Sequence, residues 1–283
     1  MSPANLRFEN LVKDVPINEQ AFIHEMKNTT PPTQTYVIVF TARSGSTWLT
    51  TVLSNTEQMG HPEEYINPDF VGDVAKSLNS RQQGPFLEML QRRRKTPNGV
   101  FGMEVREMDV ALFGAESFFQ MFGPSTVFFN LWRDNIVAQA VSLYRAVTTG
   151  RFHSNDGKEG SSMPIYSAEG IQTWMEHLVM SENANLVMLK RERRPFINLR
   201  YEDMVKDKAG TLKLFTDAVE LELRKRPAVQ PEAELKKIGD TWNNEAEQQF
   251  RSEMAECVAK FEARRAIKSY IISQSNGLRL TPV

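Results

Sequence analysis

One stretch, residues 36–49, constrains the fold of this chain more than any other. It reads YVIVFTARSGSTWL: an unbroken apolar run, a loop of small and polar residues, then the start of a helical pattern. A short apolar run of this kind is typical of a strand buried on both faces. A strand, a small-residue loop and a helix start in this order point backbone N–H groups at one anion. The stretch therefore predicts a buried strand followed by a phosphate-binding loop. A polar turn without a ligand remains the alternative.

The charge balance and the cysteine content limit the classes of partner. The chain has 283 residues with 34 basic and 35 acidic side chains, a formal net charge of -1. Bulk electrostatics therefore does not favour nucleic acid, and any anion site must be local. Cys257 is the single cysteine and cannot form an internal disulfide. The N-terminal residues lack the apolar core of a signal peptide, and no apolar run is long enough to span a bilayer. We expect a cytoplasmic protein with no transmembrane segment and no nucleic-acid partner.

Further apolar runs predict three more strands, at residues 100–105, 126–132 and 195–201. Helical spacing separates them. The predicted helices cover residues 46–54, 69–95, 109–122, 136–147, 167–185 and 210–226, with a long last helix from 231 onward. Strands that alternate with helices indicate βαβ units and a mainly parallel sheet. The prediction is one α/β domain over residues 35–283, with helices on both faces of the sheet, after an N-terminal arm at residues 1–34.

Polar residues near the predicted strand ends are candidates for a site. Arg133 follows the third strand, where open α/β sheets bind ligands, and Ser142 lies in the next helix. An ion pair between Arg133 and Asp134 is the alternative. Glu63 and Glu64 lie in a loop past the anion loop, where two solvated acids are equally compatible with the sequence. The polar stretch at residues 150–163 has the composition of a mobile lid.

Four segments together resemble the bacterial trehalose 2-sulfotransferase family and, more broadly, enzymes that use 3′-phosphoadenosine 5′-phosphosulfate (PAPS). They are YVIVFTARSGSTWL, GHPEEY, TPNGVFG and WRDNIVAQAVSLYRA with TTGRFH. They occur in the family's order within residues 36–201, and the C-terminal third matches more faintly. The resemblance implies a P-loop-like fold of the kind shared by sulfotransferases and nucleoside triphosphatases. It also implies PAPS as the sulfuryl donor, 3′-phosphoadenosine 5′-phosphate (PAP) as the product, and no metal.

The resemblance also implies roles for individual residues. The loop that holds the 5′-phosphosulfate would consist of Arg43, Ser44, Gly45, Ser46 and Thr47, flanked by Trp48. Arg133 and Ser142 would bind the 3′-phosphate, and Tyr201 would lie near the adenine. Glu64 falls where the trehalose enzyme has its catalytic carboxylate. The segment with Lys236, Lys237, Gly239, Asp240 and Trp242 is similar to a motif that closes over the 3′-phosphate.

These roles agree with the chemistry of the residue types. By analogy with phosphoryl transfer, sulfuryl transfer depends mainly on positioning and electrostatics. The loop N–H groups and Arg43 would stabilise charge on the departing phosphate. Glu64 would remove the proton of an acceptor hydroxyl, its pKa raised by burial under the substrate. Relatives often have a lysine where this chain has Glu104. We expect Glu63, Glu104 and Arg106 near the acceptor, unless Glu104 and Arg106 only form a local ion pair.

The prediction is an O-sulfotransferase that acts on a carbohydrate or glycolipid, with the acceptor left open. Two alternatives remain from the sequence. One is a P-loop-type kinase or NTPase, in which Asp134 holds a metal, although no lysine follows Gly45 as such a loop requires. The other is a non-catalytic nucleotide-binding protein of the same fold. The trehalose enzyme is a homodimer, which makes a homodimer possible here.

Overall fold

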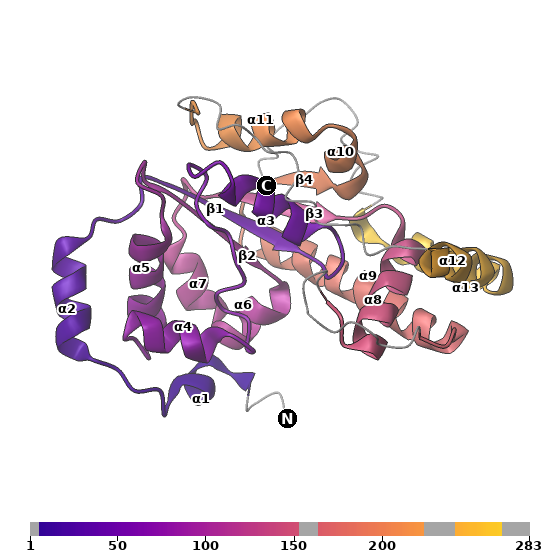
Figure 1. The fold of residues 1–283 in the computed structure, drawn as a ribbon, viewed down its shortest axis with the longest axis horizontal. Helices are drawn as coiled ribbons and strands as arrows, with labels where there is room; N and C mark the ends of the chain where they lie inside the picture. Colours follow the sequence, from indigo (N-terminus) through magenta and orange to yellow (C-terminus); the bar gives the residue numbers. More distant parts are fainter. Residues whose placement is uncertain (1–5, 153–163, 224–240, 268–283) are drawn as a thin grey trace.

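A computed structural model describes residues 6–152, 164–223 and 241–267 of the chain. Its centre is a four-stranded sheet of β1 (Gln34–Phe40), β2 (Val100–Val105), β3 (Val127–Trp132) and β4 (Phe196–Arg200). The strand order is β2-β1-β3-β4, and every neighbouring pair is parallel (Figure 1). The predicted parallel α/β sheet is therefore confirmed. All four C-terminal strand ends lie along one edge of the sheet, where such sheets bind their ligands.

Helices cover both faces of the sheet, as predicted (Figure 1). One face carries α4 (Val71–Leu78), α5 (Gln83–Arg94), α6 (Glu107–Phe113) and α7 (Ala115–Met121). The other carries α3 (Ser46–Ser54), α10 (Tyr201–Lys206) and α11 (Lys208–Ala218). Beyond the strand ends lie α8 (Ile136–Thr149), α12 (Thr241–Glu253) and α13 (Ala255–Arg264). Helix α9 (Ala168–Arg191) packs against α8 and extends to the α4–α7 face, where Leu186 and Leu189 join its apolar cluster.

The side-chain alternation of β1 explains how one strand supports both layers. Val37 and Val39 join the apolar cluster formed with α4–α7, whereas Tyr36, Ile38 and Phe40 join the cluster on the α3 side. All five side chains are buried. Successive residues of a strand point to opposite faces, so an unbroken apolar run is what a central strand between two helical layers requires.

Several predicted helices differ from those in the structure, because local backbone features interrupt them. The helix predicted over 69–95 is two helices, separated where Asn79 has φ +52°. The one predicted over 109–122 is split at Gly114, whose φ is +121°. The long last helix is interrupted at Met254, and α11 ends before Glu220, at φ +53°. Apolar spacing continues through such breaks, so periodicity alone does not reveal them.

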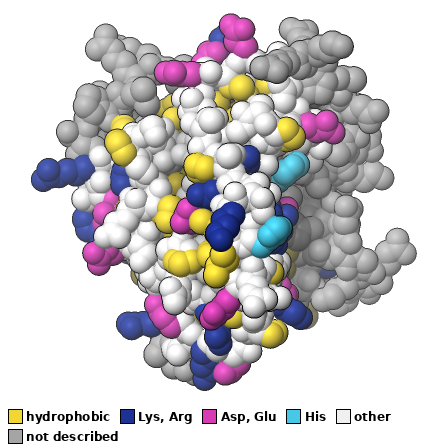
Figure 2. Space-filling model, turned by 90° about the vertical axis from the view of Figure 1, so that its left-hand side faces the viewer, with side chains coloured by type: hydrophobic (Ala, Val, Ile, Leu, Met, Phe, Trp, Pro, Cys, Tyr) yellow, Lys and Arg dark blue, Asp and Glu magenta, His cyan; other side chains and the backbone are white. Residues whose placement is uncertain are grey.

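The N-terminal arm contains α1 (Phe8–Val12) and α2 (Glu19–Asn28) and packs on the α4–α7 layer. The Phe8 ring lies 5.3 Å from that of Phe86 and 4.7 Å from that of Phe113. Arg93 of α5 forms an ion pair with Glu25 of α2. On the side of the molecule that α2 covers, acidic and basic side chains are interspersed with apolar ones (Figure 2). The arm therefore shares the core of the domain.

Candidate active site

The anion loop lies between β1 and α3, in the order strand, loop and helix that the sequence predicts. Gly45 has φ +89° and precedes the first residue of α3, and Arg43 has φ +63°. Ser44 is fully buried, and its hydroxyl donates to the Thr41 carbonyl at 2.7 Å. A Cβ on residue 45 would lie 2.5 Å from the ring of Tyr201. Both the positive φ and the close ring therefore require glycine at this position.

Beside this loop lie the residues predicted to bind the nucleotide. The Nε of Arg43 donates to the Ser142 hydroxyl at 3.0 Å. The Arg133 guanidinium lies 4.8 Å from the centre of the Tyr201 ring, and one of its nitrogens is 3.4 Å from the Arg43 carbonyl. Arg133 Nε is buried and has no hydrogen-bond partner among the described residues. Two guanidinium groups, a hydroxyl and an aromatic ring thus meet at the ends of β1, β3 and β4.

The alternative ion pair of Arg133 with Asp134 is not formed. Asp134 instead lies 3.9 Å from Arg200. Of the remaining loop residues, Thr47 is exposed and Trp48 is half-buried, with the ammonium of Lys208 5.9 Å from its ring. Trp48 therefore offers a flat apolar surface at the edge of the loop.

On the β2 side of the loop lies Glu64, whose Oε2 faces an amide and a guanidinium group. The Asn67 side-chain amide donates to Glu64 Oε2 at 2.7 Å, and an Arg106 nitrogen is 3.8 Å from the same oxygen. Glu63 is exposed, but its carbonyl accepts a hydrogen bond from the Glu104 backbone N–H at 3.1 Å. This bond holds the Glu63–Glu64 segment against the end of β2.

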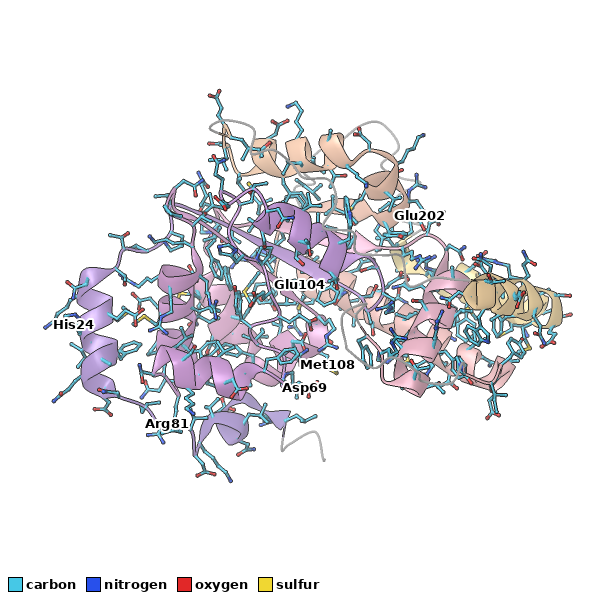
Figure 3. All side chains as sticks on the ribbon, viewed as in Figure 1. His24, Asp69, Arg81, Glu104, Met108 and Glu202 are labelled. Atoms are coloured by element: carbon cyan, nitrogen blue, oxygen red, sulfur yellow. The ribbon has the colours of Figure 1, made fainter. Side chains whose placement is uncertain are left out.

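Glu104 has the most unusual environment of the acidic residues near the loop. Only 6% of it is exposed, and its Oε2 has no hydrogen-bond partner among the described residues. Burial, followed by the nearby charge of Glu64, raises the pKa of Glu104 to about 8. A hydrogen bond with Ser46 and the charge of Arg106 act in the opposite direction and lower this pKa. Figure 3 shows Glu104 inside the molecule, with Asp69 and Met108 nearer the surface. Glu104 is therefore a neutral acid at pH 7, between the anion loop and Glu64.

The alternative interpretation of Glu104 and Arg106, a local ion pair between them, is not what the structure has. The Arg106 guanidinium donates two hydrogen bonds to Asp109, each of 2.8 Å. The Arg106 backbone N–H also donates to Asp109 Oδ2, at 3.0 Å, which caps α6. Asp109 is buried, so its charge requires this partner. Arg106 thereby faces Glu64 from a fixed position.

Sequence reasoning missed two residues that hold the loop and the strand ends. Gln139 is fully buried in α8, and its side-chain amide donates to Thr41 Oγ1 at 3.0 Å and to the Ala42 carbonyl at 2.7 Å. Asn185 of α9 donates to the Phe40 carbonyl at 2.9 Å. A polar residue within an otherwise apolar helix face is the signal that could have found Gln139.

Some predicted features lie outside the described residues. These are Lys236, Lys237, Gly239, Asp240 and most of the 150–163 loop. Within the described residues, no group of three or more His, Cys, Asp or Glu side chains could hold a metal ion. Among the same residues, no helix is both long enough and apolar enough to cross a bilayer.

A parallel sheet of this order, with an anion loop after a central strand, is a P-loop-like nucleotide-binding architecture. The chain belongs to the Stf0 sulphotransferase family, whose model matches residues 35–253. It is therefore a sulfotransferase, which confirms the resemblance seen in the sequence. The Mycobacterium tuberculosis (strain ATCC 35801 / TMC 107 / Erdman) trehalose 2-sulfotransferase is 23% identical over 245 residues, which cover 73% of this chain and 92% of that protein.

Solved sulfotransferase structures are also similar to this chain. Sulfotransferase STF9 from Mycobacterium avium is 15% identical with a TM-score of 0.49, and the match covers 84% of this chain and 79% of that one. Mouse sulfotransferase SULT7A1, complexed with PAP, is 13% identical with a TM-score of 0.45. Here the match covers 91% of this chain and 95% of the mouse chain.

Proposed function

We propose that this sulfotransferase transfers the sulfuryl group of PAPS to a hydroxyl of a carbohydrate or glycolipid, with Glu64 as the general base. The observation that carries the proposal is that the two sides of the anion loop carry side chains of opposite charge. Two guanidinium groups lie on the β3 side, and a carboxylate lies on the β2 side. A sulfuryl donor with anionic groups at both ends requires the guanidinium groups. An acceptor hydroxyl that must lose a proton requires the carboxylate.

The donor fits the residues on the β3 side. The buried Arg133 Nε has an unused hydrogen atom, and Ser142 adds a hydroxyl beside Arg43. We assign Arg133 and Ser142 to the 3′-phosphate of PAPS and the loop at residues 43–47 to its 5′-phosphosulfate. Trp48 and Tyr201 supply flat surfaces for the adenosine, of which Tyr201 already contacts Arg133. Guanidinium groups suit phosphate because they offer several donors in one plane.

The reaction then needs one proton transfer and one displacement at sulfur. Glu64 takes the proton of the acceptor hydroxyl while that oxygen forms a bond to the sulfur atom. The bond between sulfur and the phosphate oxygen breaks, and its electron pair stays on PAP. Loop N–H groups and Arg43 stabilise the charge that grows on this phosphate, an effect worth about 2.7–4 kcal/mol per donor in other enzymes. The neutral Glu104 adds no negative charge beside the loop at pH 7.

A carbohydrate or glycolipid acceptor is proposed because the relative from Mycobacterium tuberculosis is named a trehalose 2-sulfotransferase. The acceptor side of this chain places the Glu64 carboxylate beside the Arg106 guanidinium. Hydroxyl-rich acceptors pair with such mixed donors and acceptors of hydrogen bonds. The kinase alternative has less support, because Asp134 lies 3.9 Å from Arg200.

Donor binding is the first test of the proposal. Thermal unfolding is measured with PAP, without magnesium, and compared with ATP plus magnesium. We expect PAP to raise the midpoint and ATP plus magnesium to have little effect, since a ligand that binds only the folded state stabilises it. Absence of stabilisation by PAP would remove the donor assignment. Stronger stabilisation by ATP with magnesium would favour a kinase or NTPase. Normal PAP binding without transfer to any sugar or glycolipid would favour a non-catalytic protein.

A further inference from the structure

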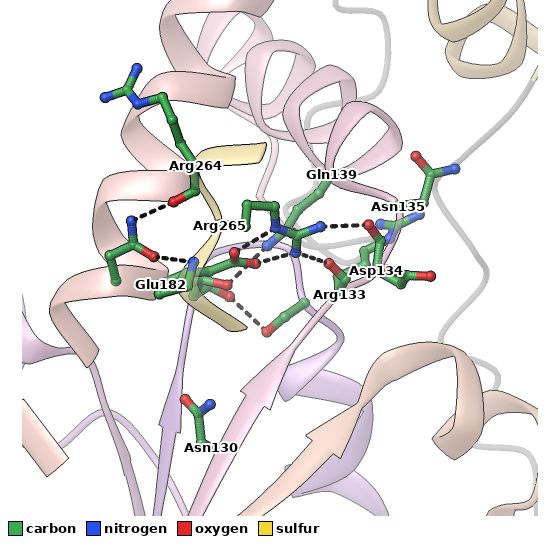
Figure 4. A network of polar contacts seen from close by, with 12 residues as sticks. Asn130, Arg133, Asp134, Asn135, Gln139, Glu182, Arg264 and Arg265 are labelled. Carbon is green, nitrogen blue, oxygen red and sulfur yellow. Dashed lines mark hydrogen bonds and ion pairs between the residues drawn. The ribbon is translucent and has the colours of Figure 1, made fainter. Parts of the chain in front are cut away.

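Arg265, which follows α13, has an unusual place for an arginine. Only 1% of the residue is exposed, although it lies near the end of the described chain. Its Nε donates to Glu182 Oε2 at 2.8 Å, and its Nη2 to Glu182 Oε1 at 2.6 Å (Figure 4). The guanidinium also lies 5.4 Å from the centre of the Trp132 ring. A buried charge must be paired and hydrogen-bonded to be tolerated, and Arg265 satisfies both conditions.

The remaining donors of Arg265 reach the turn between β3 and α8. Its Nη1 donates to the Asp134 carbonyl at 2.7 Å, and its Nη2 to the Arg133 carbonyl at 2.5 Å (Figure 4). One side chain thus holds two successive carbonyl groups at the end of β3. A planar guanidinium can contact both carbonyls and a carboxylate at once, whereas the single ammonium group of lysine cannot.

The same turn is held from its other side by an acidic side chain. Glu202, the second residue of α10, accepts hydrogen bonds from the backbone N–H groups of Asp134 at 3.0 Å and Asn135 at 3.2 Å. A cation therefore contacts the carbonyl groups of the turn, and an anion contacts its amides. Charge-assisted hydrogen bonds are the stronger ones, so both contacts restrict the backbone.

Arg133 projects from this restrained turn toward the anion loop. Its guanidinium is bounded by the Tyr201 ring at 4.8 Å and by the Arg43 carbonyl at 3.4 Å. The peptide carbonyl of Arg133 is one that Arg265 holds. A shift of this peptide would move the whole Arg133 side chain relative to the loop.

We propose that Arg265 is a positioning residue for recognition of the nucleotide's 3′-phosphate, because it fixes the strand end from which Arg133 projects. This inference rests on the proposed function, in which Arg133 contacts that phosphate. It gives the segment after α13 a role in donor selectivity, through the backbone and without contact with the nucleotide. Preorganised contacts lose effect when their supporting residues are loosened.

The test compares two nucleotides that differ in one group. Dissociation constants of PAP and of adenosine 5′-monophosphate are measured by calorimetry for the natural protein and for Arg265→Lys. The selectivity ratio, the dissociation constant of the monophosphate divided by that of PAP, reports recognition of the 3′-phosphate alone. We expect this ratio to fall about tenfold in the variant, while binding of the monophosphate changes little. A general loss of structure would weaken the binding of both nucleotides and leave the selectivity ratio unchanged.

Asn183→Ala is the matched control for the same segment. The Asn183 side chain contacts the Arg264 carbonyl at 3.2 Å and the Ala266 N–H at 3.0 Å, and so holds the chain on both sides of Arg265. It has no contact with the β3–α8 turn. We expect this variant to lose some thermal stability and to keep the selectivity ratio.

A second variant removes the ion pair without leaving a buried charge. In Glu182→Leu/Arg265→Met both charged groups are replaced by apolar ones, a change that proteins often tolerate. If Arg265→Lys does not fold, this double variant takes its place and is expected to show the same loss of selectivity. Each of these variants is also made in a protein that already carries Arg133→Ala. There, neither Arg265→Lys nor Glu182→Leu/Arg265→Met should lower the selectivity ratio further, because both act through Arg133.

The outcomes separate this inference from the proposed function. A natural protein that does not prefer PAP over the monophosphate would overturn the proposed donor. A clear preference that survives in Arg265→Lys, or in the double variant, would overturn the positioning role alone. The positioning role would also be contradicted if Asn183→Ala lowered the selectivity ratio equally. A further fall of the ratio when either change is added to Arg133→Ala would contradict it too.

Discussion

The two sides of the anion loop differ in charge and in how that charge is held. On the β3 side, Arg43 and Arg133 meet beside Ser142, and both guanidinium groups stay charged at any physiological pH. On the β2 side, Glu64 and Glu104 lie beside Arg106, and the charge there depends on protons. A permanent positive site suits a donor that is always anionic. A titratable site suits an acceptor that must release a proton. The comparison therefore predicts that changes on the two sides have separable effects.

The largest effect is expected on the β2 side, from Glu64→Gln. Turnover should fall by about 10²–10⁴-fold, because the acceptor hydroxyl loses its general base. Affinity for PAP should remain, since Glu64 lies on the acceptor side. Steady-state kinetics and calorimetry measure the two quantities. Glu63→Gln is the control, because its side chain is exposed, and it should keep its turnover. Equal losses in the two variants would remove Glu64 as the base.

The next largest effect is expected on the β3 side, from Arg133→Ala. PAP affinity should fall about 10–100-fold, which corresponds to the loss of a hydrogen bond to a charged group. The KM of the acceptor should not change. Arg200→Ala is a matched control, since Arg200 is the last residue of β4 and pairs with Asp203 on the surface. A change in acceptor KM without a change in PAP affinity would reverse the roles of the two sides.

A smaller effect is expected from the protonation of Glu104. Above pH 8 this carboxyl becomes charged next to Ser46 of the anion loop, in a field that also includes Glu63, Glu64, Arg106 and Tyr36. PAP affinity should therefore decrease by about tenfold as pH rises through about 8, a magnitude typical of one nearby unit charge. In Glu104→Gln the group stays neutral, so the decrease should disappear.

The same group predicts a pH dependence of stability with a defined sign. The folded protein keeps the Glu104 proton up to about pH 8, whereas the unfolded chain loses it near the ordinary value of 4.5. The unfolded state thus binds fewer protons between these values, and this group's contribution to stability falls as pH rises across that window. Chemical denaturation between pH 5 and 9 measures how the free energy of unfolding depends on pH. This dependence should be shallower in Glu104→Gln, and an unchanged dependence would contradict the assignment.

The smallest effect is expected from Tyr201, which stacks on Arg133. Tyr201→Leu should weaken PAP binding about threefold, as a cation–π contact of about 0.5–1 kcal/mol implies. Tyr201→Phe keeps the ring and should bind like the natural protein. A large loss in the phenylalanine variant would mean that the hydroxyl, and not the ring, matters at this position.

The sequence predicted the parts of this site that depend on local patterns. The unbroken apolar run and the small residues after it indicated a buried strand, a loop and a helix start, which are β1, residues 41–45 and α3. Arg133 and Ser142 were expected to bind one phosphate together, which stays a prediction; the hydrogen bond to Ser142 in the structure comes from Arg43. What the sequence could not predict depends on distant contacts. Arg265 and Glu182 are 83 positions apart, and Glu202 reaches a turn 68 positions earlier. Pairs of this kind leave no periodic signal.

Helix ends and the charge of Glu104 were also beyond local patterns. The breaks at Asn79 and Gly114 occur at positive φ angles, and a Cβ at Gly114 would lie 2.6 Å from the distant Gln83 side chain. The neutral state of Glu104 results from burial under α3 and from the nearby Glu64, which only the folded chain brings together.

Transfer of labelled sulfate tests the central claim most directly. The protein is incubated with PAPS labelled in its sulfuryl group, and with a panel of sugars and glycolipids, at saturating donor and without magnesium. The proposed function predicts that label moves to a hydroxyl of at least one acceptor. Glu64→Gln should slow this transfer by about 10²–10⁴-fold, whereas Glu63→Gln should not. Label that stays on the nucleotide with every acceptor, or moves equally well in Glu64→Gln, would contradict the account.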